Sequence, residues 1–168
     1  MRRPRSTTLL IALFFGGLAL LWGLERAGVL TEAERERRRD RVLPELLDVP
    51  ESDVNRVEIE RGEERLVFER EGPRRWRMVE PYDVEASATA VDRVVAMMKG
   101  LRKSPEAGVL DGPADEYGLA PPEVAATLRR EAGGPPLARL EVGRTIQDER
   151  FVRARPDAGV EVAARAPL

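Results

Sequence analysis

The sequence contains no cysteine and no histidine in its 168 residues. Without cysteine, the chain can form no disulfide bond and has no thiolate to act as a nucleophile or a metal ligand. Without histidine, it lacks the usual general base near neutral pH and the commonest nitrogen ligand of metals. Any metal would have to be a hard ion held by oxygen atoms alone. We therefore expect no cofactor, no metal site and no catalytic residue, in a protein that is not an enzyme.

An excess of one charge is missing as well. The chain has 28 basic and 30 acidic residues, and its formal net charge is -2. Its basic residues are arginines except for Lys99 and Lys103, a bias that GC-rich codon usage explains. Acidic residues lie among the arginines almost everywhere, so no continuous basic stripe is available to displace counterions from DNA. Nucleic acid is therefore not an expected partner.

One long segment has no charge at all. Residues 7–24, TTLLIALFFGGLALLWGL, form an 18-residue apolar run that ends near Trp22. As a helix this run would be roughly 27 Å long, close to the hydrocarbon thickness of a bilayer. A cleaved signal peptide is the alternative, but large and charged residues follow the run where a small-x-small cleavage site would be needed. The pattern predicts an uncleaved, single-pass transmembrane helix, with the lipid bilayer as its first partner.

Arginines flank both ends of this predicted span. The flank 1–6 carries three of them and no acidic residue, whereas most of those beyond Leu24 lie more than ten residues away and alternate with acids. Because the first helix usually takes its orientation from its nearest flank, we expect a cytoplasmic N-terminus. The localisation expected is the inner (cytoplasmic) membrane, with the C-terminal domain periplasmic or otherwise extracytoplasmic.

The next segment, 25–44, is dense in charge and reads as a stalk. Thr31 and Glu34 have the spacing of a capping box, and Glu34 and Arg38 form a favourable i,i+4 pair. This pattern predicts a short solvated helix that holds the following domain away from the membrane. Contact between its arginines and anionic lipid headgroups is a compatible alternative.

A domain is expected over 45–168, and it begins with three short alternating segments. Turn residues separate VNRVEIERG (54–62), RLVFERE (65–71) and RRWRMVEP (74–81). Alternation of apolar and polar residues predicts an antiparallel meander with one solvated face. The residues expected to point inward are Val57, Ile59, Leu66, Phe68, Trp76 and Met78.

A helix is expected next, over 87–101, because the apolar period changes to that of a helix. Ser87 or Asp83 is the candidate N-cap, and Gly100 lies near the end. We expect both Met97 and Met98 to fill the core. The predicted core anchors of the domain are Trp76, Met78, Val91, Val95 and Met98.

Strands are expected again after this helix, at 124–131, 137–144, 150–156 and 159–165. The predicted fold class is α+β: an N-terminal transmembrane helix, then two antiparallel β-meanders around one amphipathic helix. The pattern leaves open whether the strands form one sheet or two.

The segment DEYGLAPPEV (115–124) lies between the two sets of strands. Asp111 could cap a short helix from Pro113 to Tyr117, and Gly118 would end it with a left-handed residue. Two prolines then exclude further helix, so the next residues should be a strand. The predicted structural joint is Tyr117, Gly118, Leu119, Pro121 and Pro122, with Tyr117 and Leu119 anchored in the core.

Two other roles remain open for acidic and aromatic residues. A hydrolase could use paired carboxylates, either Asp115 with Glu116 or Asp111 with Glu116. These acids are equally explained by capping and solvation. A carbohydrate- or peptidoglycan-binding module could use Trp76 and Tyr82 if both were exposed, although the alternation predicts that Trp76 is buried.

Four motifs in this order give the chain a resemblance to a known family. A Trp-x-x-x-x-Pro segment (Trp76, Pro81), a helix, a Tyr-Gly-Leu-x-x-Pro joint and a strand ending in Gly143 are similar to those of the bacterial domain-of-unknown-function family 4340. The resemblance covers about residues 45 to 155, and many relatives are longer at the C-terminus. Relatives are often encoded beside ABC-type export systems and gliding-motility-type components. The resemblance therefore implies an envelope accessory protein whose partner is a membrane subunit of an ABC-type exporter.

Overall fold

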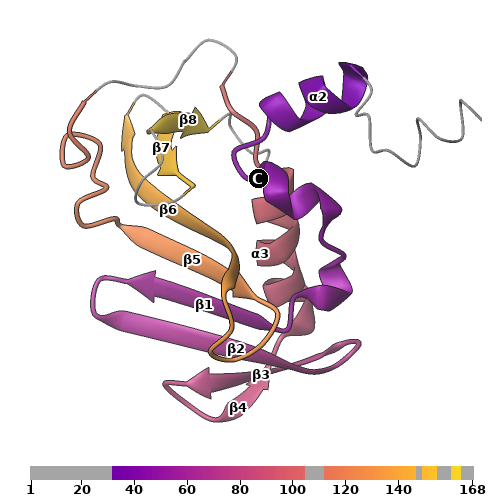
Figure 1. Ribbon diagram of the computed structural model, residues 1–168. Coiled ribbons are helices and arrows are strands. Elements are labelled where there is room, and N and C mark those ends of the chain that lie inside the picture. The colour runs from indigo at the N-terminus through magenta and orange to yellow at the C-terminus, as the bar shows by residue number, and fades with distance from the viewer. Residues whose placement is uncertain (1–31, 105–111, 147–148, 155–159, 164–168) are drawn as a thin grey trace, which may run out of the picture. The chain divides into compact units, whose positions relative to one another are not determined.

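A computed structural model describes residues 32–104, 112–146, 149–154 and 160–163 (Figure 1). Its contacts divide the chain into two units, Met1–Arg37 and Arg38–Leu168. The predicted span 7–24 and the capping residue Thr31 lie outside the described residues. Within the described ranges, no helix is long and apolar enough to cross a membrane. The N-terminal unit contributes most of α2 (Glu32–Arg39), a helix of arginine, glutamate and one alanine that is exposed along nearly its whole length.

The described residues of the second unit form one antiparallel sheet of eight strands in the order β4-β3-β2-β1-β5-β6-β7-β8. Pairing between β1 and β5 joins the two predicted meanders into a single sheet. The sequence did not decide between one sheet and two, and it did not predict β4. The strand bounds are β1 Arg56–Arg61, β2 Glu64–Gly72, β3 Arg75–Glu80, β4 Val84–Ala86, β5 Val124–Arg129, β6 Pro136–Ile146, β7 Glu149–Arg153 and β8 Glu161–Ala163.

Helix α3 (Ala88–Gly100) lies against one face of this sheet (Figure 1). Ser87 occupies its N-cap position, as the sequence predicted, although its side chain makes no capping hydrogen bond. Asp83 precedes β4 and pairs with Arg77 instead. Met98 is fully buried, whereas Met97 is 48% exposed, which contradicts its expected place in the core. Successive residues of a helix point about 100° apart, so the stripe that buries Met98 leaves Met97 at its edge, turned towards solvent.

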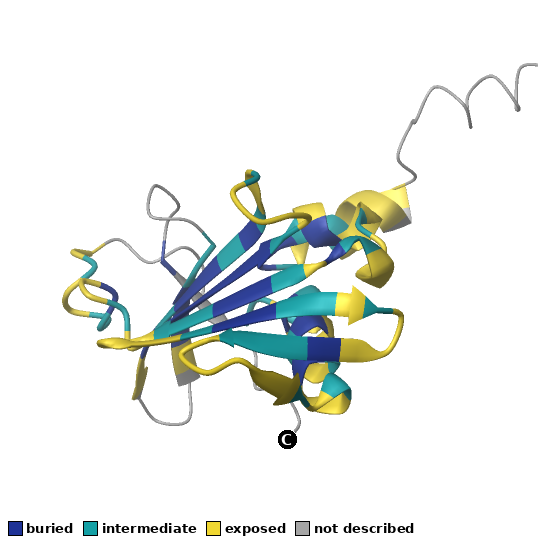
Figure 2. Cartoon of the chain, turned by 90° about the horizontal axis from the view of Figure 1, so that it is seen from below, coloured by how far each residue is buried: buried dark blue, intermediate teal, exposed yellow. Residues whose placement is uncertain are grey.

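The core lies between α3 and the sheet, and the 3-10 helix η1 (Pro44–Asp48) adds the buried Leu46 to it. A second 3-10 helix, η2 (Glu51–Asp53), follows and contributes no buried residue. Figure 2 shows buried residues along the middle of the strands and exposed residues at the hairpins. Val42 and Leu43, which the sequence placed in the stalk, are buried in this core. The backbone of this segment pairs with the chain after α3, since Val42 N–H donates to Leu101 O over 3.2 Å. The ordered domain therefore begins a few residues earlier than position 45.

Candidate functional site

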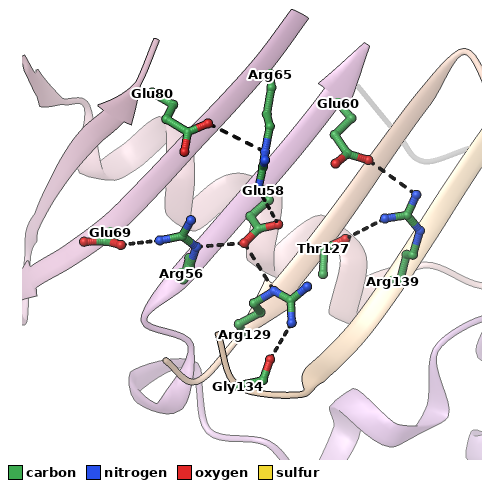
Figure 3. Close-up of polar contacts among 10 residues, drawn as sticks. All are labelled: Arg56, Glu58, Glu60, Arg65, Glu69, Glu80, Thr127, Arg129, Gly134 and Arg139. Atoms are coloured by element: carbon green, nitrogen blue, oxygen red, sulfur yellow. Dashed lines mark hydrogen bonds and ion pairs between the residues drawn. The ribbon is translucent and has the colours of Figure 1, made fainter. Parts of the chain in front are cut away.

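The face of the sheet opposite α3 is covered by arginine and glutamate (Figure 3). Side chains alternate along a strand, so the residues of β1 that flank Val57 and Ile59 point away from the helix. Those residues are Arg56, Glu58 and Glu60. We call this surface the charged face; its ion-paired members are Arg56, Glu58, Glu60, Arg65, Glu69, Glu80, Arg129, Arg139, Glu141 and Arg153.

Glu58 is the centre of one half of the charged face, and only 7% of the residue is exposed. Its Oε1 accepts hydrogen bonds from Arg56 Nε at 2.7 Å and from Arg129 Nε at 3.2 Å. Its Oε2 accepts one from Arg65 Nη2 at 3.4 Å. The three guanidinium groups come from β1, β2 and β5, so one carboxylate ties three neighbouring strands together.

Two opposing effects set the pKa of Glu58. Burial of the carboxyl acts to raise its pKa, because the charged form loses solvation. The hydrogen bond from Arg56 and the positive charges of Arg129, Arg56 and Arg65 act in the other direction and outweigh burial. The pKa of Glu58 therefore lies below its ordinary value, and the group is ionised near neutral pH. An ionised carboxylate accepts hydrogen bonds but cannot serve as a general acid.

Glu141 on β6 is the centre of the other half, and it is 4% exposed. Arg139 Nε lies 3.2 Å from its Oε1, and Arg153 Nη2 lies 2.6 Å from its Oε2. Arg139 also contacts Glu60 at 3.4 Å, which connects this half to β1. Arg153 Nη2 in addition donates to the backbone oxygen of Leu119 over 3.1 Å. The charged face thus extends from β3 to β7 and reaches the joint.

The charged face replaces a second layer of helices over the sheet. Val67 is fully buried and Ala125 is 3% exposed, although both point away from α3. The long apolar stems of arginine can cover such residues while the guanidinium groups remain paired at the surface. Chemically, the arrangement consists of buried carboxylates that are neutralised by arginines, which suits a scaffold better than proton transfer.

Residues 113–119, which lead into the joint, form overlapping hydrogen-bonded turns rather than the short helix expected from the sequence. Leu119 N–H donates to Ala114 O over 2.8 Å, and Gly118 has a φ of 69°. The left-handed glycine is thus as the sequence predicted, whereas Asp111, the proposed cap, lies outside the described residues. Pro121 follows a cis peptide bond, Pro122 forms an isolated bridge with Leu119, and β5 begins two residues later.

Side chains of the joint form a small apolar cluster beside β7. Leu119 is 1% exposed and packs with Phe151 and Val160, and half-buried Tyr117 lies against them. The ring centroids of Tyr117 and Phe151 are 5.0 Å apart. The acidic pair Asp115 and Glu116 is exposed on the same turn. This cluster is separate from the main core, so the joint anchors the second half of the sheet.

A polar cleft of about 790 Å³ lies at the end of the sheet formed by the β2–β3 and β5–β6 hairpins. Arg70 and Asp92 line it above the buried Trp76. The guanidinium carbon of Arg70 lies 4.3 Å from the centre of the Trp76 ring, and Trp76 Nε1 donates to Asp92 Oδ1 over 2.9 Å. Arg70 and Asp92 also form an ion pair at 3.2 Å. Their side chains therefore hold one another and the tryptophan in place.

A family model described as a domain of unknown function (DUF4340) matches residues 76–167, which is just over half of the chain. The chain belongs to the DUF4340 family. The match begins at the buried Trp76 and takes in α3, the joint and β5 to β8, whereas β1 and β2 precede it. No curated protein and no solved structure matches the chain.

Within this DUF4340 chain, the structure distributes the residues singled out from the sequence over several places. Trp76, Val91, Val95 and Met98 lie in the main core, and half-buried Met78 packs against it. Of the two aromatic residues considered for carbohydrate binding, Tyr82 is 70% exposed and Trp76 is fully buried. No group of three or more acidic residues in the described ranges is placed to hold a metal ion. The alternation of Arg56, Glu58 and Glu60 is visible in the sequence, but it predicted a solvated face and not the ion pairs that bury Glu58.

We predict that Trp76→Phe lowers the free energy of unfolding by about 2 kcal/mol or more, because Asp92 loses the indole donor and the smaller ring leaves a cavity at a fully buried position. Urea unfolding of the full-length chain, followed by circular dichroism, measures this difference. Tyr82→Phe removes one hydroxyl from an exposed ring and is the matched control, with an expected change within about 0.5 kcal/mol. Equal midpoints for the parent and Trp76→Phe would show that neither the contact to Asp92 nor the packing of the indole contributes to stability.

Proposed function

We propose that this DUF4340 chain is a single-pass protein of the bacterial inner membrane whose C-terminal α+β domain lies outside the cytoplasm. There it acts as a non-enzymatic binding domain, auxiliary to an ABC-type export complex. The membrane part of the proposal is supported by the charge-free run 7–24 and the basic flank before it. The partnership with an exporter is supported by the resemblance of the chain to proteins that are encoded beside such systems.

The observation that carries the non-enzymatic part is the pairing of the buried carboxylates Glu58 and Glu141 with arginines. A hydrolase that uses two carboxyl groups needs one of them protonated near neutral pH, which requires a raised pKa. The pKa of Glu58 is instead lowered. Together with the lack of cysteine and histidine, this pairing favours a domain that works through its surface.

Topology and partnership are tested in the native bacterium. A C-terminal alkaline phosphatase fusion should be active, and a reporter that fluoresces only in the cytoplasm should stay dark at the same position. The tagged full-length chain, solubilised from membranes in mild detergent, should copurify membrane subunits of an ABC-type exporter that are absent from a tag-only control. An inactive phosphatase fusion would overturn the orientation. Recovery of no membrane protein above the control would overturn the partnership.

A further inference from the structure

An apolar groove of about 360 Å³ lies between the first turns of α3 and the sheet. Its walls come from the α3-facing side of β1 to β4 and from the helix itself. Ile59, Met78 and Val94 line it and are only half-buried, and Ala90 on its rim is exposed. The lining residues are Val57, Ile59, Phe68, Met78, Glu85, Ala86, Ser87, Ala90, Val91 and Val94. The core of the domain is therefore incompletely covered at this place.

Strand β4 forms one rim of the groove and is also the last strand at its edge of the sheet (Figure 1). One side of β4 pairs with β3, and in the described part of the chain no strand pairs with the other side. Backbone donors and acceptors along such an edge can receive one more strand. The edge and the groove thus form one continuous surface.

The register of β4 shows what each face of an added strand would meet. Val84 pairs with Met78 and Ala86 with Trp76, so Val84 and Ala86 share the face of the sheet that packs on α3. Val84 is nevertheless 47% exposed. Glu85 pairs with Arg77, so its side chain points to the opposite face although the residue also borders the groove. An added strand would therefore place alternate side chains in the groove and beside Glu85.

Acidic groups dominate the other face of this edge. Arg77 contacts Glu71 at 2.9 Å and Asp83 at 3.2 Å, and Glu85 adds a third carboxylate to its surroundings. One guanidinium thus faces three carboxylates. A second copy of β4 in antiparallel pairing would bring acid against acid, and like charges opposite one another destabilise a strand pair. Charge complementarity instead requires a basic partner.

We propose that the outer edge of β4 and the adjoining groove accept an extended segment of a partner protein in which apolar side chains alternate with lysine or arginine. This deepens the proposed function and rests on it, since the segment would belong to the partner of the domain. Backbone hydrogen bonds with β4 provide the pairing. Apolar side chains of the segment enter the groove between Met78 and Val94, and its basic side chains meet Asp83 and Glu85.

The test uses the full-length protein in mild detergent and a fluorescent eight-residue peptide of alternating valine and lysine. Fluorescence anisotropy should show saturable binding, and a peptide of alternating valine and glutamate should bind at least tenfold more weakly. Ala90→Glu places a charge on the rim of the groove and should weaken binding at least tenfold. Glu85→Lys should weaken it at least fivefold by reversing the charge. Ala96→Glu makes the same change at another exposed position of α3 and should leave binding within twofold.

Three results would overturn the inference: no binding of the valine-lysine peptide, equal binding of both peptides, or unchanged binding by Ala90→Glu. A dimer that Ala90→Glu converts to a monomer, measured by light scattering, would instead assign the groove to a second copy of the chain. Copurification separates this inference from the proposed function. If Ala90→Glu still recovers the exporter subunits, a different surface holds the partner and the proposed function stands. If the parent recovers none, the proposed function fails whatever the peptide does.

Discussion

Gly143→Ala should lower the free energy of unfolding by about 3 kcal/mol or more, the upper end of the range for overpacking. A Cβ atom at position 143 would lie 2.0 Å from the backbone oxygen of Tyr117 and 3.0 Å from Cγ of Leu119. A backbone oxygen cannot swing aside as the end of a side chain can. The joint would have to move away from β6, and the hydrogen bond from Arg144 N–H to Tyr117 O, 2.9 Å long, would be lost.

Gly100→Ala is the matched control for this prediction. It makes the same change at the end of α3, where no atom lies within 4 Å of the added Cβ and the backbone φ is not positive. Its expected effect is neutral or stabilising by about 0.5 kcal/mol, because alanine restricts the unfolded chain more than glycine does. Urea unfolding of full-length chains compares both variants with the parent. A Gly143→Ala midpoint equal to that of Gly100→Ala would mean that the joint does not cross β6 so closely.

The joint shows how far local sequence patterns reach. The glycine at 118 followed by two prolines predicted a left-handed residue and a return to strand, since both follow from steric limits within a few residues. The close crossing of the joint over β6 was not predictable in this way. It depends on the packing of Tyr117 against the backbone of Gly143, 26 residues later in the chain. Local propensities carry no information about contacts between residues so far apart in sequence.

The sheet and its charged face likewise combine features that local sequence patterns predict with features that only long-range contacts determine. Alternation predicted β1, β2 and β3, because a strand with one buried face repeats every two residues. It gave no sign of β4, which has three residues and a half-exposed valine. Arginine and glutamate on the other face read as a solvated surface. The burial of Glu58 follows only from the β1–β5 register, which brings Arg129 next to it across about 70 residues of chain.

Glu58→Gln should lower the free energy of unfolding by about 3 kcal/mol at pH 7, because Arg56, Arg65 and Arg129 lose the one carboxylate that they share. The pKa of Glu58 is depressed in the folded state. Its contribution to stability is therefore fully present above the unfolded pKa of about 4.3 and is lost as the pH falls below that value through the folded pKa. The difference between parent and variant should shrink on acidification over this range.

Glu60→Gln is the matched control, since it makes the same change two residues along β1 on the same face. Glu60 Oε2 lies 3.4 Å from Arg139 Nη2, and the side chains of Glu60 and Arg139 are 40% and 31% exposed. Partly exposed pairs of this kind contribute less than about 1 kcal/mol, so this variant should stay close to the parent. Urea unfolding at pH 7 and at several pH values below about 4.3 measures the free energy of unfolding of the parent, Glu58→Gln and Glu60→Gln. Equal losses for Glu58→Gln and Glu60→Gln would show that burial does not distinguish the two carboxylates. A difference that grows on acidification would reverse the sign assigned to the pKa of Glu58.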